Sequence, residues 1–138
     1  MYLHIPAPHP PWLVDTNGKY LRDKVEKTGY TAEVSYLNKQ VIPLLKSIIQ
    51  HSKNPPVIIL QADHGWGDVA ARRMYILNAY YLPDAANVVY STITPVNTFR
   101  TIFNTYFGGK YPLLPDESFY SPLDDFYDFV KEPQACPK

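Results

Sequence analysis

The chain has 138 residues, a length that can bury the hydrophobic core of one domain. Its 13 basic and 13 acidic residues cancel and are interspersed, so no basic surface indicates nucleic acid as a partner. Its single cysteine, Cys136, excludes a disulfide framework and a thiolate metal cluster, and no apolar run approaches the roughly 18 residues that span a bilayer.

The first 20 residues combine an apolar start with a proline-rich loop and a turn. Residues 2–5 look like a strand joined in mid-course, and we expect the natural protein to extend upstream of Tyr2. Residues 15–18, Asp-Thr-Asn-Gly, are a strong turn signal. The 14 prolines and 12 tyrosines of the chain predict long ordered loops over an apolar framework, since disordered chains are poor in aromatic residues.

An amphipathic helix is predicted from residue 32 to residue 52. Its apolar residues recur at steps of three and four: Val34, Leu37, Val41, Leu44, Leu45, Ile48 and Ile49. Thr31 is placed to cap the N-terminus of this helix. Pro43 should kink it, because an interior proline removes one backbone hydrogen bond at a cost of about 3 kcal/mol. Residues 54–56, Asn-Pro-Pro, then stop the helix.

Two strands are predicted after this helix. Residues 57–60, Val-Ile-Ile-Leu, form a continuous apolar run that is typical of a strand buried on both faces. A second strand is expected at residues 74–82, which end before Pro83. A helix followed by a buried strand favours α/β layers, so the predicted fold class is α/β, with a mostly parallel sheet, flanking helices and long proline-rich loops.

The last third of the chain is predicted to hold one more helix. Residues 98–106 place apolar and aromatic side chains at helical spacing, and the glycine pair at 108–109 is a natural stop. From residue 110 onward a proline-rich loop is expected, with one short strand or helical turn at residues 126–130. These elements are predicted to form a single partial domain over residues 1–138.

The first candidate site follows the predicted strand at once. Residues 61–68 read Gln-Ala-Asp-His-Gly-Trp-Gly-Asp. In open α/β sheets ligands bind beyond the carboxyl ends of the strands. There Asp63 and His64 could supply two metal ligands together, while the glycines let the backbone turn tightly. The alternative is a plain loop in which Asp63 caps a turn and His64 is solvated.

The proline-rich segment 4–12 contains two further candidates, His4 and His9. Proline keeps such a segment extended, so its imidazoles are presented at little ordering cost. An imidazole near a metal can bind an oxyanion or pass a proton to a leaving group. Taken alone, each of these histidines also fits a structural or surface role, and His51 at the polar end of the predicted helix fits a surface role.

Taken together, these features resemble the carboxyl-terminal half of sulfatase-like proteins of the alkaline phosphatase superfamily, which includes arylsulfatases, phosphoglycerol transferases and lipoteichoic acid synthases. The resemblance covers roughly residues 2–120. Its parts, in order, are the Pro-His-Pro-Pro-aromatic loop at 8–12, the amphipathic helix, the strand ending in Asp-His-Gly, and residues 76–83 and 94–100. The Asp-His-Gly triplet is weakly specific alone, and the ordered set is much stronger.

The resemblance implies a divalent metal, Mn, Ca, Zn or Mg, held partly by Asp63 and His64. It also implies that His9, or less favourably His4, contacts the sulfate or phosphate group of an ester substrate. The nucleophile and further acidic ligands of such enzymes belong to the amino-terminal half of the fold. No Cys-x-Pro-x-Arg signature and no Asp-x-x-x-His pair occurs in this sequence. We therefore expect a fragment that binds no metal tightly, is inactive alone and lacks the amino-terminal half of its own domain.

Three functional readings remain open. The first is a fragment of a metal-dependent hydrolase or transferase acting on sulfate or phosphate esters, and within it a phosphoglycerol-type transferase would use lipid-linked donors. The alternative outside enzymes is an inactive sulfatase-like binding or scaffold domain, whose Trp12, Trp66 and tyrosines grip a carbohydrate or a partner protein. Many relatives carry amino-terminal membrane helices, so the resemblance implies an extracytoplasmic, membrane-anchored parent.

Overall fold

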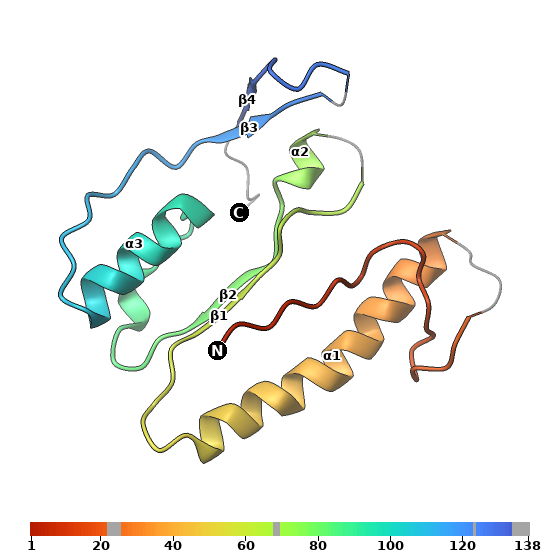
Figure 1. Ribbon diagram of the computed structural model, residues 1–138, viewed down its shortest axis with the longest axis horizontal. Helices are drawn as coiled ribbons and strands as arrows, with labels where there is room; N and C mark the ends of the chain where they lie inside the picture. The colour runs from red at the N-terminus through yellow and green to blue at the C-terminus, as the bar shows by residue number, and fades with distance from the viewer. Residues whose placement is uncertain (22–25, 68–69, 123, 134–138) are drawn as a thin grey trace. The chain divides into compact units, whose positions relative to one another are not determined.

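The computed structural model describes residues 1–21, 26–67, 70–122 and 124–133. Cys136 lies outside these residues. The chain divides into two compact units, Met1–Pro55 and Pro56–Lys138, which are described separately below. Figure 1 shows the helices and strands along the chain. Within the described residues, no helix is long and apolar enough to cross a membrane.

The first unit is built on one long helix, α1, Glu26–His51. It begins before the predicted start at residue 32, so Thr31 lies inside the helix and its predicted role as N-cap is wrong. Pro43 also lies inside it, and the helix is assigned without interruption on either side. A proline costs a helix one hydrogen bond, but the remaining turns of a 26-residue helix are enough to keep it continuous.

The proline-rich amino-terminal loop packs on the first half of α1. Trp12 is buried, and a Cβ added at Gly29 would lie 2.9 Å from the Trp12 Cβ, so glycine lets the indole approach the helix closely. The buried Glu33 side chain accepts a hydrogen bond from the backbone N–H of Leu13 at 3.1 Å. No strand is assigned at residues 2–5, where the sequence suggested one.

The turn predicted at residues 15–18 is present. The carboxylate of Asp15 accepts hydrogen bonds from the backbone N–H groups of Asn17 at 2.8 Å and Lys19 at 2.9 Å. These two hydrogen bonds hold the pKa of Asp15 below its ordinary value. Gly18 has a φ of +83°, which glycine adopts without strain. The ammonium group of Lys39 on α1 donates to the Thr16 carbonyl at 2.6 Å, which ties the turn to the helix.

The second unit opens with a pair of antiparallel strands, β1, Ile58–Gln61, and β2, Asn78–Tyr81. Ile58 pairs with Tyr81, and Gln61 pairs with Asn78. Both predicted strands are therefore present, each shifted or shortened at its ends. The run at 57–60 is half-buried or exposed rather than buried on both faces, because β1 has one strand neighbour in the described residues.

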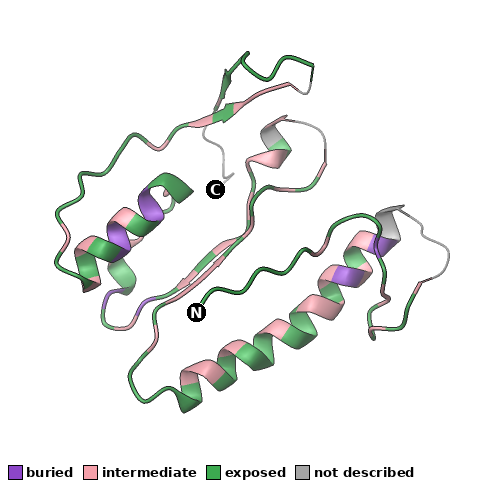
Figure 2. Cartoon of the chain, viewed as in Figure 1, coloured by how far each residue is buried: buried purple, intermediate pink, exposed green. Residues whose placement is uncertain are grey.

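Three helical elements accompany this strand pair: one lies between β1 and β2 in the sequence, and two follow β2. They are α2, Ala70–Arg73, the 3₁₀-helix η1, Ala86–Val88, and α3, Pro95–Tyr106. The buried core of the unit joins Leu82, Ala85 and Ile102, with half-buried apolar residues of β1 and β2 packed against it. Figure 2 shows the buried residues of α3 gathered within an otherwise exposed helix. This core fixes α3 beside the chain that leaves β2.

The α3 helix begins three residues before the predicted start and ends where predicted. Pro95 occupies its first turn, where a missing N–H costs nothing. At the other end Gly108 has a φ of +67°, and the N–H of Gly109 donates to the Phe103 carbonyl at 3.0 Å. The glycine pair therefore closes the helix as the sequence predicted.

Two asparagines of α3 hold the segment that follows it. The fully buried Asn97 donates to the Leu114 carbonyl at 2.8 Å and accepts from the Leu114 N–H at 2.9 Å. Asn104 makes the same pair of hydrogen bonds with the backbone of Tyr111, both at 2.8 Å. An extended segment without strand partners is thereby ordered along the helix.

A second antiparallel pair closes the unit: β3, Ser118–Tyr120, and β4, Val130–Glu132. The sequence expected one short strand or turn at residues 126–130, and the strand begins at the end of that range. The mixture of helices and strands is confirmed. Both strand pairs in the described ranges are antiparallel, so the mostly parallel sheet is not seen there. The apolar run located β1 but carried no information about the direction of its neighbour.

Candidate functional site

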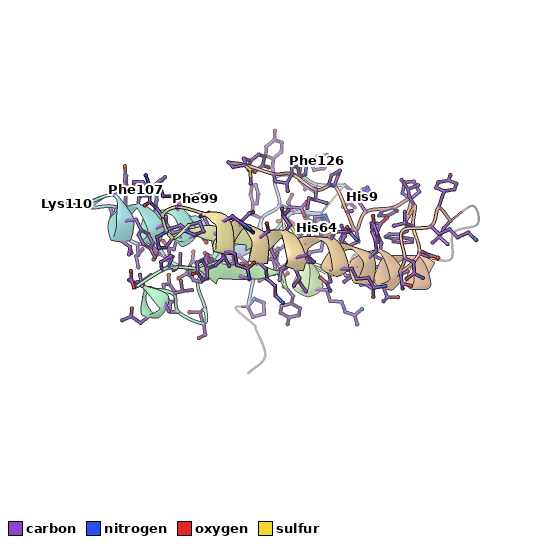
Figure 3. The ribbon with its side chains drawn as sticks, turned by 90° about the horizontal axis from the view of Figure 1, so that it is seen from below. His9, His64, Phe99, Phe107, Lys110 and Phe126 are labelled. Carbon is purple, nitrogen blue, oxygen red and sulfur yellow. The ribbon has the colours of Figure 1, made fainter. Side chains whose placement is uncertain are left out.

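Asp63 and His64 lie directly after β1, at its carboxyl end. The loop that carries them is fixed at two points, to the last residue of α2 and to the chain just before β2. The N–H of Ala62 donates to the Leu77 carbonyl at 2.9 Å, and the N–H of Gly65 donates to the Arg73 carbonyl at 2.8 Å. Both site residues are exposed, and Figure 3 labels the His64 side chain. The side chains of the predicted pair are therefore accessible to solvent, and hydrogen bonds fix the backbone of the loop that carries them.

Gly65 is required by the close approach of two backbone segments. A Cβ added there would lie 2.1 Å from the Arg72 carbonyl oxygen and 2.5 Å from the Tyr75 carbonyl oxygen. No side chain fits that space without moving the backbone. Gly67, in contrast, has no atom within 4 Å of an added Cβ, and its φ of +93° is the reason for glycine. The two glycines of the loop therefore serve different purposes.

The two side chains bring a carboxylate and an imidazole to one place. One carboxylate oxygen of Asp63, Oδ1, accepts the backbone N–H of His64 at 2.9 Å. The other oxygen, Oδ2, lies 3.7 Å from the Nε2 atom of His64. The remaining ring nitrogen, Nδ1, lies 2.8 Å from the Gly65 carbonyl oxygen. The side chain of Asp63 is 89% exposed and that of His64 is 41% exposed, so one side of the pair is open to solvent.

This pair fits part of a divalent-metal site. Two donors bonded to one ion at about 2.0–2.2 Å can be at most about 4.4 Å apart, and the Oδ2 to Nε2 separation of 3.7 Å is within that limit. A mixed oxygen and nitrogen donor set suits Zn²⁺ and Mn²⁺ among the divalent ions. Within the described ranges, no group of three or more His, Cys, Asp or Glu side chains is arranged to hold a metal. The pair supplies two ligands and leaves the other positions to groups from elsewhere.

Two arginines next to this loop were missed by the sequence analysis. Arg72 and Arg73 end α2, and their carbonyl oxygens are the backbone atoms that crowd or hydrogen-bond Gly65. Arg72 is exposed and Arg73 is half-buried. Guanidinium groups are the side chains best suited to phosphate and sulfate oxygens. The adjacent pair, eight and nine residues after His64, was the available signal in the sequence.

His4 and His9 belong to the first unit. Both are exposed: the ring of His4 stacks on Tyr2 with centroids 6.5 Å apart, and the Nδ1 atom of His9 lies 2.6 Å from the Pro10 carbonyl oxygen. Figure 3 labels His9. Asp63 and His64 belong to the second unit. The predicted catalytic residues and the predicted metal ligands are therefore carried by different units. The oxyanion contact expected of His9 stays a prediction.

A second polar cluster, around Asp116, serves structure. Its carboxylate accepts hydrogen bonds from the Tyr90 hydroxyl at 2.5 Å, from the Thr94 N–H and hydroxyl, both at 2.7 Å, and from the Asn97 amide at 3.1 Å. Burial raises the pKa of Asp116, but these hydrogen bonds outweigh burial and hold it below its ordinary value. Burial and the hydrogen bond to Asp116 raise the pKa of Tyr90.

The one hollow worth noting lies beside this second cluster. An open depression of about 680 Å³ is lined by residues from three segments: Thr92, Pro115, Asp116, Glu117, Lys131, Glu132 and Pro133. None of the four predicted site residues lines it. Its walls include a Lys131 to Glu117 ion pair at 2.5 Å, whose charges neutralise each other. The Asp63–His64 pair is the stronger candidate site, because its donors converge, whereas Asp116, Glu117 and Lys131 of the hollow already bond other side chains.

No protein family, curated protein or solved structure matches this chain.

Proposed function

We propose that this chain is the metal-ligand-bearing part of a sulfatase-like hydrolase or transferase of the alkaline phosphatase superfamily, acting on sulfate or phosphate esters. The observation that carries the proposal is the Asp63–His64 pair at the end of β1, with Oδ2 and Nε2 separated by 3.7 Å. The ordered motifs that resemble the carboxyl-terminal half of that superfamily support it. The mostly parallel sheet of that fold, completed by residues outside this chain, is part of the proposal.

A divalent ion bound in this place would polarise the ester oxygen and lower the pKa of a nucleophile. The residues of this chain hold the ion from one side. The Oδ1 atom of Asp63 accepts the backbone N–H of His64. The other carboxylate oxygen, Oδ2, is left to contact the ion. His64 offers a neutral nitrogen on the same open side of the loop.

An anionic ester is the substrate class that the surroundings favour. Arg72 and Arg73 follow the loop on α2 and are joined to it through the backbone of Gly65. Their charge would attract a sulfate or phosphate group toward the metal side of the loop. The nucleophile is assigned to the amino-terminal half of the domain, so this chain alone is expected to be inactive.

The experiment compares the chain with the natural-length protein on p-nitrophenyl phosphate, p-nitrophenyl sulfate and a phosphodiester analogue, with added Mn²⁺, Ca²⁺ or Zn²⁺. The natural-length protein should turn over at least one ester, and Asp63→Ala and His64→Ala should each reduce that rate by several orders of magnitude. His51→Ala is the matched control and should leave the rate unchanged, because the hydrogen bond of His51 in the described residues is to its own helix, through Ser47. Equal rates in all variants would refute the proposal.

Metal binding by the chain alone is the second measurement. Two protein ligands bind a divalent ion weakly, since metal sites generally use three or more. Calorimetric titration with Zn²⁺ or Mn²⁺ should show little site-specific heat. Tight binding of one ion that is abolished by His64→Ala would show a self-contained site and contradict the fragment reading.

One observation favours the alternative function, an inactive binding or scaffold domain. Phe99 and Phe103 on α3 and Phe107 directly after it are exposed, with neighbouring ring centroids 6.0 and 5.9 Å apart. Figure 3 labels Phe99 and Phe107. Exposed aromatic residues in a row are typical of an interaction surface. Of the two tryptophans expected to grip a ligand, Trp12 is buried and only Trp66 is exposed, so Trp12 is unsuited to that role.

A further inference from the structure

The His64 ring has two nitrogens with different surroundings. Nδ1 lies 2.8 Å from the carbonyl oxygen of Gly65, and Nε2 lies 3.7 Å from Oδ2 of Asp63. A carbonyl oxygen accepts hydrogen bonds and cannot donate one, so Nδ1 must carry the ring proton in this contact. The neutral ring then has its lone pair on Nε2, the nitrogen that faces the carboxylate.

The residue that carries this carbonyl, Gly65, is held through its N–H and its Cα. It donates to the Arg73 carbonyl at 2.8 Å and packs so closely against Arg72 and Tyr75 that no Cβ can be added. The end of α2 therefore fixes the position of the residue whose carbonyl selects the proton position of His64. In metal sites, a ligating histidine commonly donates its other N–H to a backbone carbonyl, which fixes the tautomer and the ring orientation.

We infer that Gly65 is the positioning residue of this site: its carbonyl fixes His64 as the Nδ1–H tautomer and leaves Nε2 to bind a divalent cation together with Oδ2 of Asp63. The cation half of this inference rests on the proposed function. The tautomer half rests only on the loop, so the two can fail separately.

The test is long-range ¹H–¹⁵N correlation NMR of the whole ¹⁵N-labelled chain at about pH 8.5, where an ordinary imidazole is neutral. His64, assigned with a His64→Gln variant, should show a protonated Nδ1 and an unprotonated Nε2. His4, whose ring stacks on Tyr2, is the comparator and should show the tautomer mixture of a solvated imidazole. An Nε2–H tautomer, or a mixture equal to that of His4, would overturn the inference.

Two glycine variants separate positioning from simple loop strain. Gly65→Ala should displace the 62–65 backbone and shift His64 toward the tautomer mixture of His4, because the new Cβ would meet the Arg72 carbonyl. Gly67→Ala is the matched control: no described residue lies within 4 Å of the new Cβ, so His64 should keep the Nδ1–H tautomer although the positive φ strains the alanine backbone. If Gly65→Ala does not fold, the spectrum of the unaltered chain still decides.

A Zn²⁺ titration followed by the same spectra tests the cation half. The Nε2 resonance of His64 should move while the Nδ1 proton persists. Movement of Nδ1 with loss of its proton would overturn the assignment of the binding nitrogen. The spectra could show the Nδ1–H tautomer while neither the chain nor the natural-length protein binds Zn²⁺ or Mn²⁺. That result would refute the proposed function and uphold the positioning role of Gly65.

Discussion

Replacing Asn97 with alanine should destabilise the second unit far more than the same change at Asn104. Both asparagines clamp the backbone of the segment after α3 through two hydrogen bonds. They differ in surroundings. The Asn97 side chain is fully buried and also donates to the Tyr90 hydroxyl at 3.0 Å and to the Asp116 carboxylate at 3.1 Å. Asn104 makes its hydrogen bonds at an exposed site.

The magnitude follows from these contacts. Neutral hydrogen bonds contribute about 1 kcal/mol each, and one to a carboxylate about 2 kcal/mol. The two N–H hydrogens of the Asn97 amide serve three acceptors, so the side chain makes at most three full hydrogen bonds, two neutral and one to the carboxylate, which sum to roughly 4 kcal/mol. Rehydration of the exposed Leu114 backbone and the better helix propensity of alanine return about 1 kcal/mol. We expect a loss of about 3 kcal/mol for Asn97→Ala. For Asn104→Ala the same reasoning gives about 1 kcal/mol.

Urea unfolding measures both values, with the fluorescence of Trp66 reporting on the second unit and Trp12→Phe removing the signal of the first. The slope of the unfolding free energy against urea should be the same in both variants, so that the change in midpoint reports stability alone. Equal losses for the two variants, or a loss below about 1 kcal/mol for Asn97→Ala, would refute the argument that burial makes the amide clamp strong.

Two further predictions follow from named residues. Because the folded pKa of Asp116 lies below its unfolded value, its contribution is complete above the unfolded pKa and is lost as pH falls through the folded one. Acid titration of the unfolding free energy should therefore show a drop below about pH 4 that Asp116→Asn reduces, and an unchanged acid dependence in that variant would contradict the prediction. Pro43→Ala should stabilise α1 by up to about 3 kcal/mol, seen by circular dichroism during urea unfolding; a loss of stability would show that the proline fits this helix better than alanine.

The sequence predicted elements better than their pairing. Residues 57–60 and 98–106 fall within one to three positions of β1 and α3, because a run of apolar residues and a helical spacing are local signals. The direction of β2 relative to β1 is set by the path of the chain through residues 62–77, and no local pattern records that path. The extended course of residues 111–116 could not be predicted from a local pattern either, because side chains of α3 order this segment through hydrogen bonds.

The candidate site was predictable in part. An aspartate and a histidine after an apolar run located Asp63 and His64, because the chemistry of a metal ligand is carried by residue type. The roles of Gly65 and Arg73 could not be predicted from the sequence. They arise from a hydrogen bond between the loop and the end of α2, which joins residues eight positions apart. Thr31 shows the opposite error: a good capping residue lies inside α1 because the helix begins at Glu26.

The two asparagine clamps also fix the length of chain between them. Asn97 and Asn104 are seven residues apart on α3, which is about 10.5 Å of helix. Their partners, Leu114 and Tyr111, are three residues apart in the opposite direction, which is about 10 Å of extended backbone. The two spans match only for this number of residues. A connecting segment usually tolerates insertions and deletions. Here one residue added between Tyr111 and Leu114 would make the extended span longer than the helical span, so that one of the two asparagines would lose its hydrogen bonds to the segment.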